Sequence, residues 1–274
     1  MLSYQHQYHA GNHADVLKHW VLLECVRYMQ NKDKPFDYID THAGAGLYRL
    51  DYGENIKPHE SREGVLKLAW DRLPGMEDYH RAVGTDLARH RYPGSPLLVK
   101  RLLRPGDKAW LFEMHPGTVE QLRRHCAERR VSHVHQEDGF KGVMRLLPSR
   151  AGRAVVLIDP SYEVKADYRT VADVMERIYR RMRQAMVLLW YPVVERHRVD
   201  GLEKAIRRGS MRNVQQFELG IDEDDAPGMT ASGVIALNPP WTLADRFKAT
   251  MPAVADMLSR DGGQHCRHRV LVDE

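Results

Sequence analysis

Cysteine is scarce in this chain of 274 residues, and a long apolar run is missing. The cysteines Cys25, Cys126 and Cys266 form no CxxC pair, which argues against a zinc ribbon, and their wide spacing argues against a disulfide framework. The longest apolar stretch, 185–194, is far too short to span a bilayer, and the amino-terminal segment lacks the apolar core of a signal peptide. We therefore expect a cytoplasmic protein with no membrane role.

Charge of one sign is not in large excess either, since 41 lysines and arginines stand against 37 aspartates and glutamates, a net charge of +4. This balance permits a polyanionic partner without requiring one. The basic clusters are spread along the chain, and each alone is more simply a solvated helix face. With a hydrophobic content of 43%, the chain can bury a sizeable core, so we expect a single domain over 1–274.

Short apolar runs bounded by turn residues predict buried strands, most of them separated by helical patterns such as 118–130 and 168–183. Alternating strands and helices predict an α/β fold with a mainly parallel sheet covered on both faces. A stretch from about 50 to 90 interrupts the alternation and predicts a small helical insertion. The expected strands are 36–39, 109–112, 131–135 (the weakest), 154–158, 186–190, 214–219 and 234–237.

The link between the last two strands, 220–233, consists mostly of glycine, proline, aspartate and small polar residues. It is too short for a helical crossover, so these two strands should pair antiparallel. The tail from Asp261 onward is polar, ends in one short apolar patch, and is not among the predicted strands.

The first strand leads into a glycine-bearing turn, Asp40-Thr41-His42-Ala43-Gly44-Ala45-Gly46, at the carboxyl edge of the sheet. The bare backbone at Gly44 lets a ligand such as an adenosine cofactor approach closely. The dinucleotide fingerprint GxGxxG fails because Arg49 stands where its last glycine belongs, which weakens nicotinamide or flavin chemistry. S-adenosylmethionine, which has no phosphates, fits better, with Asp40 orienting its cationic methionine end.

Two further acidic strand ends follow in order along the chain. Glu113 ends the second strand, where adenosine cofactors commonly find a carboxylate for the ribose hydroxyls. The sequence Glu137-Asp138-Gly139-Phe140 follows the third strand, where a carboxylate that accepts from the adenine amine and an adjacent apolar ring would complete the site. Three such strand ends in the right order favour S-adenosylmethionine as the cofactor.

The apolar run at 155–158 leads into Asp159-Pro160-Ser161-Tyr162, which resembles the (Asp/Asn)-Pro-Pro-aromatic turn of amino-group methyltransferases. The exocyclic amine of adenine is a poor nucleophile because its lone pair is delocalised into the ring. A carboxylate and a carbonyl that accept its N–H hydrogens draw it toward tetrahedral geometry, and Asp159 and the Pro160 carbonyl are the candidates. Tyr162 would stack on the extruded base. Ser161 replaces the second proline of the motif, which relaxes the restraint on Pro160.

A rival sequence, Asn238-Pro239-Pro240-Trp241, matches that consensus better. The strand before it should run antiparallel to the rest, so its end should lie on the opposite edge of the sheet from the cofactor turns. We therefore expect Asn238 to be structural and Asp159 to be catalytic.

The amino-terminal segment is dense in histidine and aromatic residues. His9, His13, Asp15 and His19 could suggest a metal, but no downstream cluster completes such a site, and no metal is expected. Aromatic and imidazole rings near Lys18 suit stacking on unpaired bases and contacts with phosphates, so Lys18 is a candidate substrate contact.

Several blocks of the sequence together resemble the RlmJ family of 23S ribosomal RNA adenine-N6 methyltransferases, and the likeness covers nearly the whole chain. The resemblance implies a monomer with a class I methyltransferase fold, which is Rossmann-like with a mainly parallel seven-stranded sheet, an antiparallel last strand and a small helical insertion. It also implies 23S ribosomal RNA as substrate and S-adenosylmethionine as the one cofactor. The blocks are HAGNHADVLKH, DTHAGAG, YPGSP, LIDPSY, LWYPV and GMTASG…NPPW.

The resemblance also assigns roles to individual residues of this sequence. Asp159 takes the catalytic position and Tyr4 a substrate-contacting one. The implied cofactor contacts are His19, His42, Ser95, Glu113, Asp138 and Gly139.

Two alternatives stay open at this point. The same chemistry could act on DNA, because a flipped adenine offers the same amine in either polymer. The chain could instead be a nucleic-acid-binding protein, serving the use of external DNA, that keeps a cofactor pocket and has lost turnover through Ser161.

Overall fold

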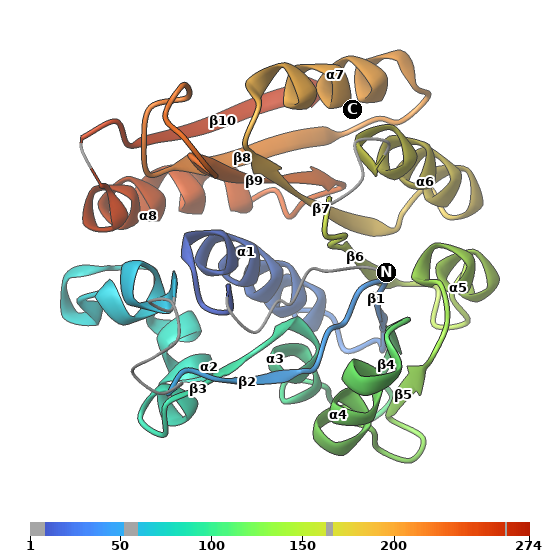
Figure 1. Cartoon of the computed structure of the whole chain (residues 1–274). Coiled ribbons are helices and arrows are strands. Elements are labelled where there is room, and N and C mark those ends of the chain that lie inside the picture. Colours follow the sequence, from blue (N-terminus) through green and yellow to red (C-terminus); the bar gives the residue numbers. More distant parts are fainter. Residues whose placement is uncertain (1–8, 52–59, 163–166, 261) are drawn as a thin grey trace.

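The computed structural model describes residues 9–51, 60–162, 167–260 and 262–274, and a mixed sheet of eight strands runs through its middle (Figure 1). The order of the strands is β10-β8-β9-β7-β6-β1-β4-β5. In chain order they are β1 (Asp37–Asp40), β4 (Lys108–Phe112), β5 (Ser132–His135), β6 (Ala154–Ile158), β7 (Met186–Val193), β8 (Val214–Gly220), β9 (Ala231–Leu237) and β10 (His265–Val272). Two short strands, β2 (Leu47–Arg49) and β3 (Arg91–Pro93), form a separate antiparallel pair.

The helices that surround these strands are α1 (His13–Gln30), α2 (Glu77–Leu87), α3 (Ser95–Lys100), α4 (Pro116–Cys126), α5 (Gly139–Leu146), α6 (Asp167–Arg181), α7 (Arg196–Arg208) and α8 (Leu243–Leu258). The 3-10 turns described between β2 and α2 are η2 (Glu60–Glu63), η3 (Val65–Lys67) and η4 (Trp70–Arg72). Within the described ranges, every helix is too short or too polar to span a bilayer.

The core of the sheet is parallel, and its carboxyl-terminal part is antiparallel. Strands β5, β4, β1, β6 and β7 pair parallel with one another. β9 lies antiparallel between β7 and β8, as the short link 220–233 predicted. The sheet has one strand more than predicted, because β10 adds antiparallel to β8 at the edge. An edge strand can be polar, and β10 contains His265, Arg267 and Arg269, so its sequence lacks the apolar run by which the other strands were predicted.

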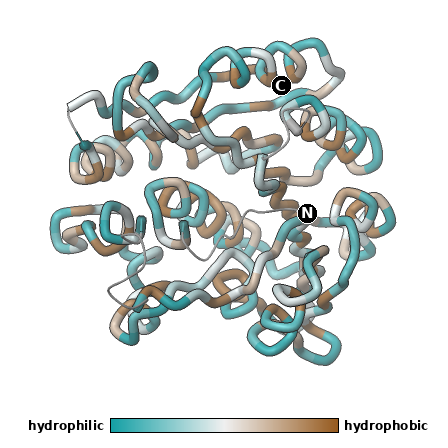
Figure 2. Tube along the Cα trace, in the orientation of Figure 1, coloured by the Kyte–Doolittle hydropathy of each residue, from teal (hydrophilic) through white to brown (hydrophobic). Residues whose placement is uncertain are grey.

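Helices cover both faces of the sheet (Figure 1), and the strands alternate their side chains between the two. In β6, Val155 and Leu157 pack toward α1, α3 and α8, whereas Val156 and Ile158 pack toward α5, α6 and α7. Figure 2 shows the apolar residues gathered mostly along the strands and the inner sides of the helices. Burial on both faces explains why this strand reads as an unbroken apolar run, and the predicted α/β fold is confirmed.

Helix α1 is another element that the sequence patterns did not predict. The Asn12 side chain caps its amino terminus by accepting from the Asp15 backbone N–H. The helix is buried nearly all round, because it lies against the sheet and is covered by α2, α3 and α8. A helix without a solvated face shows no amphipathic stripe, so its period was not visible in the sequence.

The segment between β2 and β3 holds the 3-10 turns and α2, and it packs against α1. The Trp20 indole N–H donates to the Gly75 carbonyl at 3.0 Å. The Arg27 guanidinium pairs with Asp78 at 2.8 Å. Pairing of β2 with β3 holds the two ends of this segment together. We call it the β2–β3 segment.

A buried ion cluster attaches β10 to the rest of the sheet. Glu218 on β8 is 1% exposed and pairs with Arg196 at 2.8 Å and with Arg267 of β10 at 3.1 Å. Asp224 pairs with the same two arginines. Burial alone would raise the pKa of Glu218, but hydrogen bonds from His265 and Arg196 and the charge of Arg196 lower it to about 2.

Candidate active site

Four acidic residues follow the carboxyl ends of neighbouring parallel strands. Asp40 ends β1, Glu113 follows β4, Asp138 follows β5 and Asp159 follows β6. Because β5, β4, β1 and β6 are adjacent and parallel, their carboxyl ends meet at one edge of the sheet. This carboxyl edge is therefore the place where the predicted site residues can act together.

The turn after β1 takes a shape that only glycine adopts easily. Gly44 and Gly46 have φ values of +62° and +79°. The Gly44 N–H donates to Glu113 Oε2 at 3.1 Å, and the His115 N–H donates to Glu113 Oε1 at 2.7 Å. The glycine turn and the carboxylate after β4 are thus joined, as expected for one cofactor site. Bare backbone beside a carboxylate suits an adenosine cofactor without phosphates.

Asp40 organises this turn from within. Its carboxylate is fully buried, and Oδ2 accepts from the Tyr38 and Ser95 hydroxyls at 2.7 Å each. Its Oδ1 accepts from the His42 N–H at 3.3 Å. Burial raises the pKa of Asp40 to about 6 against the effect of these hydrogen bonds. Because both oxygens already have partners, Asp40 acts on the shape of the turn and ties Ser95 to it.

His42 and the residues after β5 form the next wall of the site. The His42 ring meets the Phe140 ring edge to face, with centroids 4.9 Å apart. Burial lowers the pKa of His42 to about 4, so the ring is neutral at neutral pH. Asp138 caps α5 by accepting from the Phe140 N–H at 2.8 Å. A Cβ on Gly139 would lie 2.0 Å from the Thr41 carbonyl oxygen, so the ends of β1 and β5 touch through backbone alone.

Gly139→Ala is therefore expected to push the two strand ends apart and weaken cofactor binding. Overpacking against backbone that cannot yield costs about 1–3 kcal/mol of stability. We expect a lower melting temperature and a Kd for S-adenosylmethionine raised about tenfold, measured by titration calorimetry. Gly201→Ala is the matched control, because nothing lies within 4 Å of its added Cβ in α7. Binding equal to wild type in Gly139→Ala would show that the close approach has no role.

The turn after β6, which holds Asp159, lies beside an ion pair that joins it to α1. Lys18 Nζ lies 2.7 Å from Asp159 Oδ2 and 2.7 Å from Asp15 Oδ1. The Lys18 side chain is 4% exposed and that of Asp159 14%. Burial alone would lower the pKa of Lys18, but the two carboxylates outweigh it and raise the pKa above its ordinary range. Lys18 therefore stays charged and fixes one oxygen of Asp159.

Tyr162 is held in a strained conformation at the end of this turn. Its φ of +53° is uncommon for a residue with a bulky side chain. Its hydroxyl donates to the Trp190 carbonyl at 2.6 Å, and its ring packs against the rings of Tyr168 and Trp190. Neighbouring structure thus determines the ring position, which is typical of functional sites.

His19 connects the site to the β2–β3 segment. Its Nδ1 lies 2.6 Å from the Tyr92 hydroxyl, which lies 2.8 Å from the Tyr79 hydroxyl of α2. Its Nε2 lies 3.9 Å from Asp15 Oδ1. The helical spacing of Asp15, Lys18 and His19 places all three on one face of α1. A prediction of this helix from the sequence would therefore have grouped the three residues.

The sequence singled out two further residues, Tyr4 and Asn238. Tyr4 lies outside the described residues. Asn238 lies at the amino edge of the sheet, where its side-chain amide donates to the Arg183 and Ala185 carbonyls just before β7. No group of three or more histidines, cysteines, aspartates or glutamates in the described part of the chain is placed to hold a metal ion.

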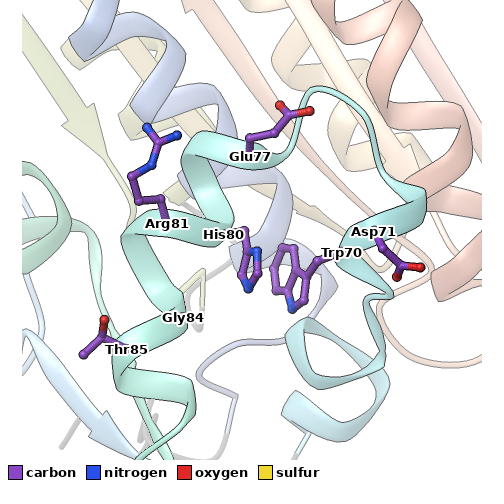
Figure 3. Close-up of a pocket in the computed structure, with 7 residues that line it drawn as sticks. All are labelled: Trp70, Asp71, Glu77, His80, Arg81, Gly84 and Thr85. Carbon is purple, nitrogen blue, oxygen red and sulfur yellow. The ribbon is translucent and has the colours of Figure 1, made fainter.

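A hollow of about 640 Å³ lies away from these residues, on the β2–β3 segment (Figure 3). The Trp70 and His80 rings stack in it almost in parallel, with centroids 4.5 Å apart. Its remaining lining residues are Asp71, Glu77, Arg81, Gly84 and Thr85. None of the predicted site residues is among them, so this hollow is separate from the carboxyl edge.

The strand order, with a glycine turn and acidic residues at the carboxyl edge, defines a class I methyltransferase fold of the S-adenosylmethionine-dependent kind. The family described as "Ribosomal RNA large subunit methyltransferase D, RlmJ" matches residues 33–270, and the chain belongs to this family. The resemblance seen in the sequence is thereby confirmed.

Individual relatives agree with this assignment over their full length. The chain is 40% identical over 272 residues to ribosomal RNA large subunit methyltransferase J of Haemophilus influenzae, with 96% of each chain covered. It is 38% identical over 281 residues to the Escherichia coli protein of the same name, with 100% of each covered. A crystal structure of a Legionella pneumophila protein matches with a TM-score of 0.88 at 29% identity, covering 96% of this chain and 98% of that one.

Proposed function

We propose that this protein transfers a methyl group from S-adenosylmethionine to the N6 amine of an adenine in 23S ribosomal RNA. The observation that carries the proposal is the position of Asp159, which follows β6 beside the turn after β1 and has one oxygen fixed by Lys18. Relatives named as large-subunit ribosomal RNA methyltransferases support the choice of substrate.

The chain's own residues position the amine. S-adenosylmethionine, when bound, supplies the electrophilic methyl group. Lys18 engages Oδ2 of Asp159, and Oδ1 has no hydrogen-bond partner among the described residues. Oδ1 and the Pro160 carbonyl then accept the two N–H hydrogens of the amine, which directs its lone pair toward the methyl group. The rings of Tyr162 and Trp190 offer the extruded base a stacking surface.

Transfer of labelled methyl from S-adenosylmethionine to unmodified 23S ribosomal RNA tests the proposal. We expect label in RNA and N6-methyladenine in its nuclease digest, identified by mass spectrometry. A DNA of equal length and sequence, assayed beside it, distinguishes the two polymers. Label in DNA alone, or methyl on another atom of the base, would contradict the proposal.

Ser161→Pro tests whether the departure from the motif limits the rate. Proline fixes φ at 161 and restricts the residue before it to extended conformations, which aims the Pro160 carbonyl more firmly. We expect kcat to rise about two- to fivefold, the size of a loop-rigidifying effect. Single-turnover transfer measures it. If the wild-type protein is a binding protein disabled at this position, this variant gains activity that the wild type lacks. A variant slower than wild type would show that the native turn depends on serine.

A further inference from the structure

The motif Asn238-Pro239-Pro240-Trp241 has no place in the proposed chemistry, yet the structure builds it firmly. Asn238 has a φ of +51°, a left-handed conformation, and its side-chain amide donates to the Arg183 carbonyl at 2.7 Å. Its backbone N–H donates to the Asn213 carbonyl at 2.9 Å. The motif therefore joins the loops that precede β7 and β8 to the end of β9, all at the amino edge of the sheet.

This construction presents Trp241 to solvent. Its side chain is 77% exposed, more than any other large hydrophobic residue in the described ranges, whereas Pro239 and Pro240 are buried. An indole held out on a rigid turn offers a flat face for stacking without losing conformational freedom on binding.

Exposed arginines lie at the same edge of the sheet as the turn, two of them in the loops that Asn238 contacts, and the described part of the chain gives them no carboxylate partner. The Arg183 guanidinium lies 5.9 Å from the Tyr179 ring centroid, and Arg212 Nη1 donates to the Met211 carbonyl. The exposed arginines at this edge are Arg181, Arg183, Arg207, Arg208 and Arg212. The carboxylates that neighbour these arginines in the chain already have other partners, since Glu176 pairs with Arg180 and accepts from the Ser210 N–H, and Glu203 accepts from the Gln216 amide.

The carboxyl edge has the opposite character, since Asp40, Glu113, Asp138 and Asp159 end its strands. The acidic loop 222–225 is also at that edge, between β8 and β9. Phosphate contacts supply most of the affinity of a protein for RNA. A catalytic edge so rich in carboxylates needs cationic surface elsewhere to bind a polyanion.

We propose that Trp241 and the five arginines form a second RNA-binding surface, which we call the amino-edge surface. It binds phosphates of an RNA segment that flanks the target, and Trp241 stacks on an unpaired base of that segment. The eight residues of β7 span about 25 Å, so the segment lies at least about eight stacked nucleotides from the target. This inference rests on the proposed function, because it takes ribosomal RNA as the substrate.

Two RNAs and two variants test the amino-edge surface. The RNAs are the full 23S transcript and the shortest fragment of it that the wild-type protein still methylates. Trp241→Ala and Arg183→Glu/Arg212→Glu are expected to raise KM for the full transcript about tenfold and to leave kcat and KM for the short fragment unchanged. The charge-reversed variant should also bind the full transcript with a shallower salt dependence, by roughly 1.5 in the slope of log K against log salt. Arg89→Glu, on the β2–β3 segment, is the control for charge alone and should match wild type.

Wild-type KM and salt slope in both variants would overturn the amino-edge surface, and so would an equal loss on both RNAs. Melting temperature and cofactor affinity equal to wild type establish that the variants are folded. If the wild-type protein does not methylate the full transcript, the proposed function fails. If it methylates both RNAs and the variants do so equally well, only the amino-edge surface fails.

Discussion

Asp159→Asn is expected to lower kcat by at least about 100-fold, nearly as much as Asp159→Ala. This loss is expected although the (Asp/Asn)-Pro-Pro-aromatic motif accepts asparagine at the same position. The reason is Lys18, whose ammonium group carries only donors and lies 2.7 Å from Oδ2. An asparagine must turn its single oxygen toward Lys18. Its NH₂ group then faces the substrate amine, so a donor meets a donor where the reaction needs an acceptor.

Single-turnover transfer to 23S RNA measures this loss, and titration calorimetry measures cofactor affinity separately. Cofactor affinity should stay within about threefold of wild type, because Asp40, not Asp159, organises the glycine turn. The double variant Lys18→Met/Asp159→Asn should be faster than Asp159→Asn alone, since the amide is free to present its oxygen once the ammonium is gone. An Asp159→Asn enzyme within tenfold of wild type would show that Lys18 does not set the requirement for a carboxylate.

Much of the sheet could be predicted because most of its strands are apolar runs bounded by turn residues. The predicted strand 154–158 coincides with β6, and 36–39 differs from β1 by one residue at each end. The antiparallel direction of β9 followed from the shortness of the link before it, and that direction correctly placed Asn238 at the amino edge. Local pattern and chain length were enough for each of these.

The elements that escaped prediction depend on tertiary contacts. α1 is buried on nearly every side, so it has no polar stripe to reveal its period. β10 is a polar edge strand whose partner Glu218 lies far away in the sequence, and its ion pairs are invisible in a pattern of hydrophobic residues. For both elements, the structure depends on residues that are distant in the sequence and become neighbours only in the folded protein.

Some contacts of the candidate site could likewise be predicted from the sequence, and others could not. The acidic strand ends were visible because parallel strands must bring their carboxyl ends together, whatever the length of the connections. The pairing of Lys18 with Asp159 was not visible, because 141 residues separate them. The sequence predicts a substrate contact for Lys18, and the structure places it between the carboxylates of Asp15 and Asp159, so that it fixes the residue proposed to accept the amine hydrogens.

Lys18→Met is expected to destabilise the protein by about 3–5 kcal/mol at neutral pH, the cost of leaving a buried charge without its partner. Methionine matches the unbranched length of lysine, so packing changes little. What is lost is the cation between the side chains of Asp15 and Asp159, which are 2% and 14% exposed. For a domain of this size the melting temperature should fall on the order of 10 °C. Lys204→Met, at an exposed position of α7, is the matched control and should melt as wild type does.

The pH dependence of the melting temperature distinguishes a loss of charge pairing from a loss of packing in Lys18→Met. In the wild type, the pKa of Lys18 is raised above its unfolded value, so its stabilisation is fully present at neutral pH and is lost only at very alkaline pH. In Lys18→Met, the two carboxylates lose their cation, and an ionised carboxylate that is buried without a partner destabilises the fold, whereas its protonated form does so much less. The variant's deficit should therefore be largest at neutral pH and shrink in acid. Asp15→Asn added to Lys18→Met should recover part of the melting temperature, since it removes one of the uncompensated charges. A deficit that is the same at every pH, and that Asp15→Asn deepens, would assign the loss to packing and not to charge.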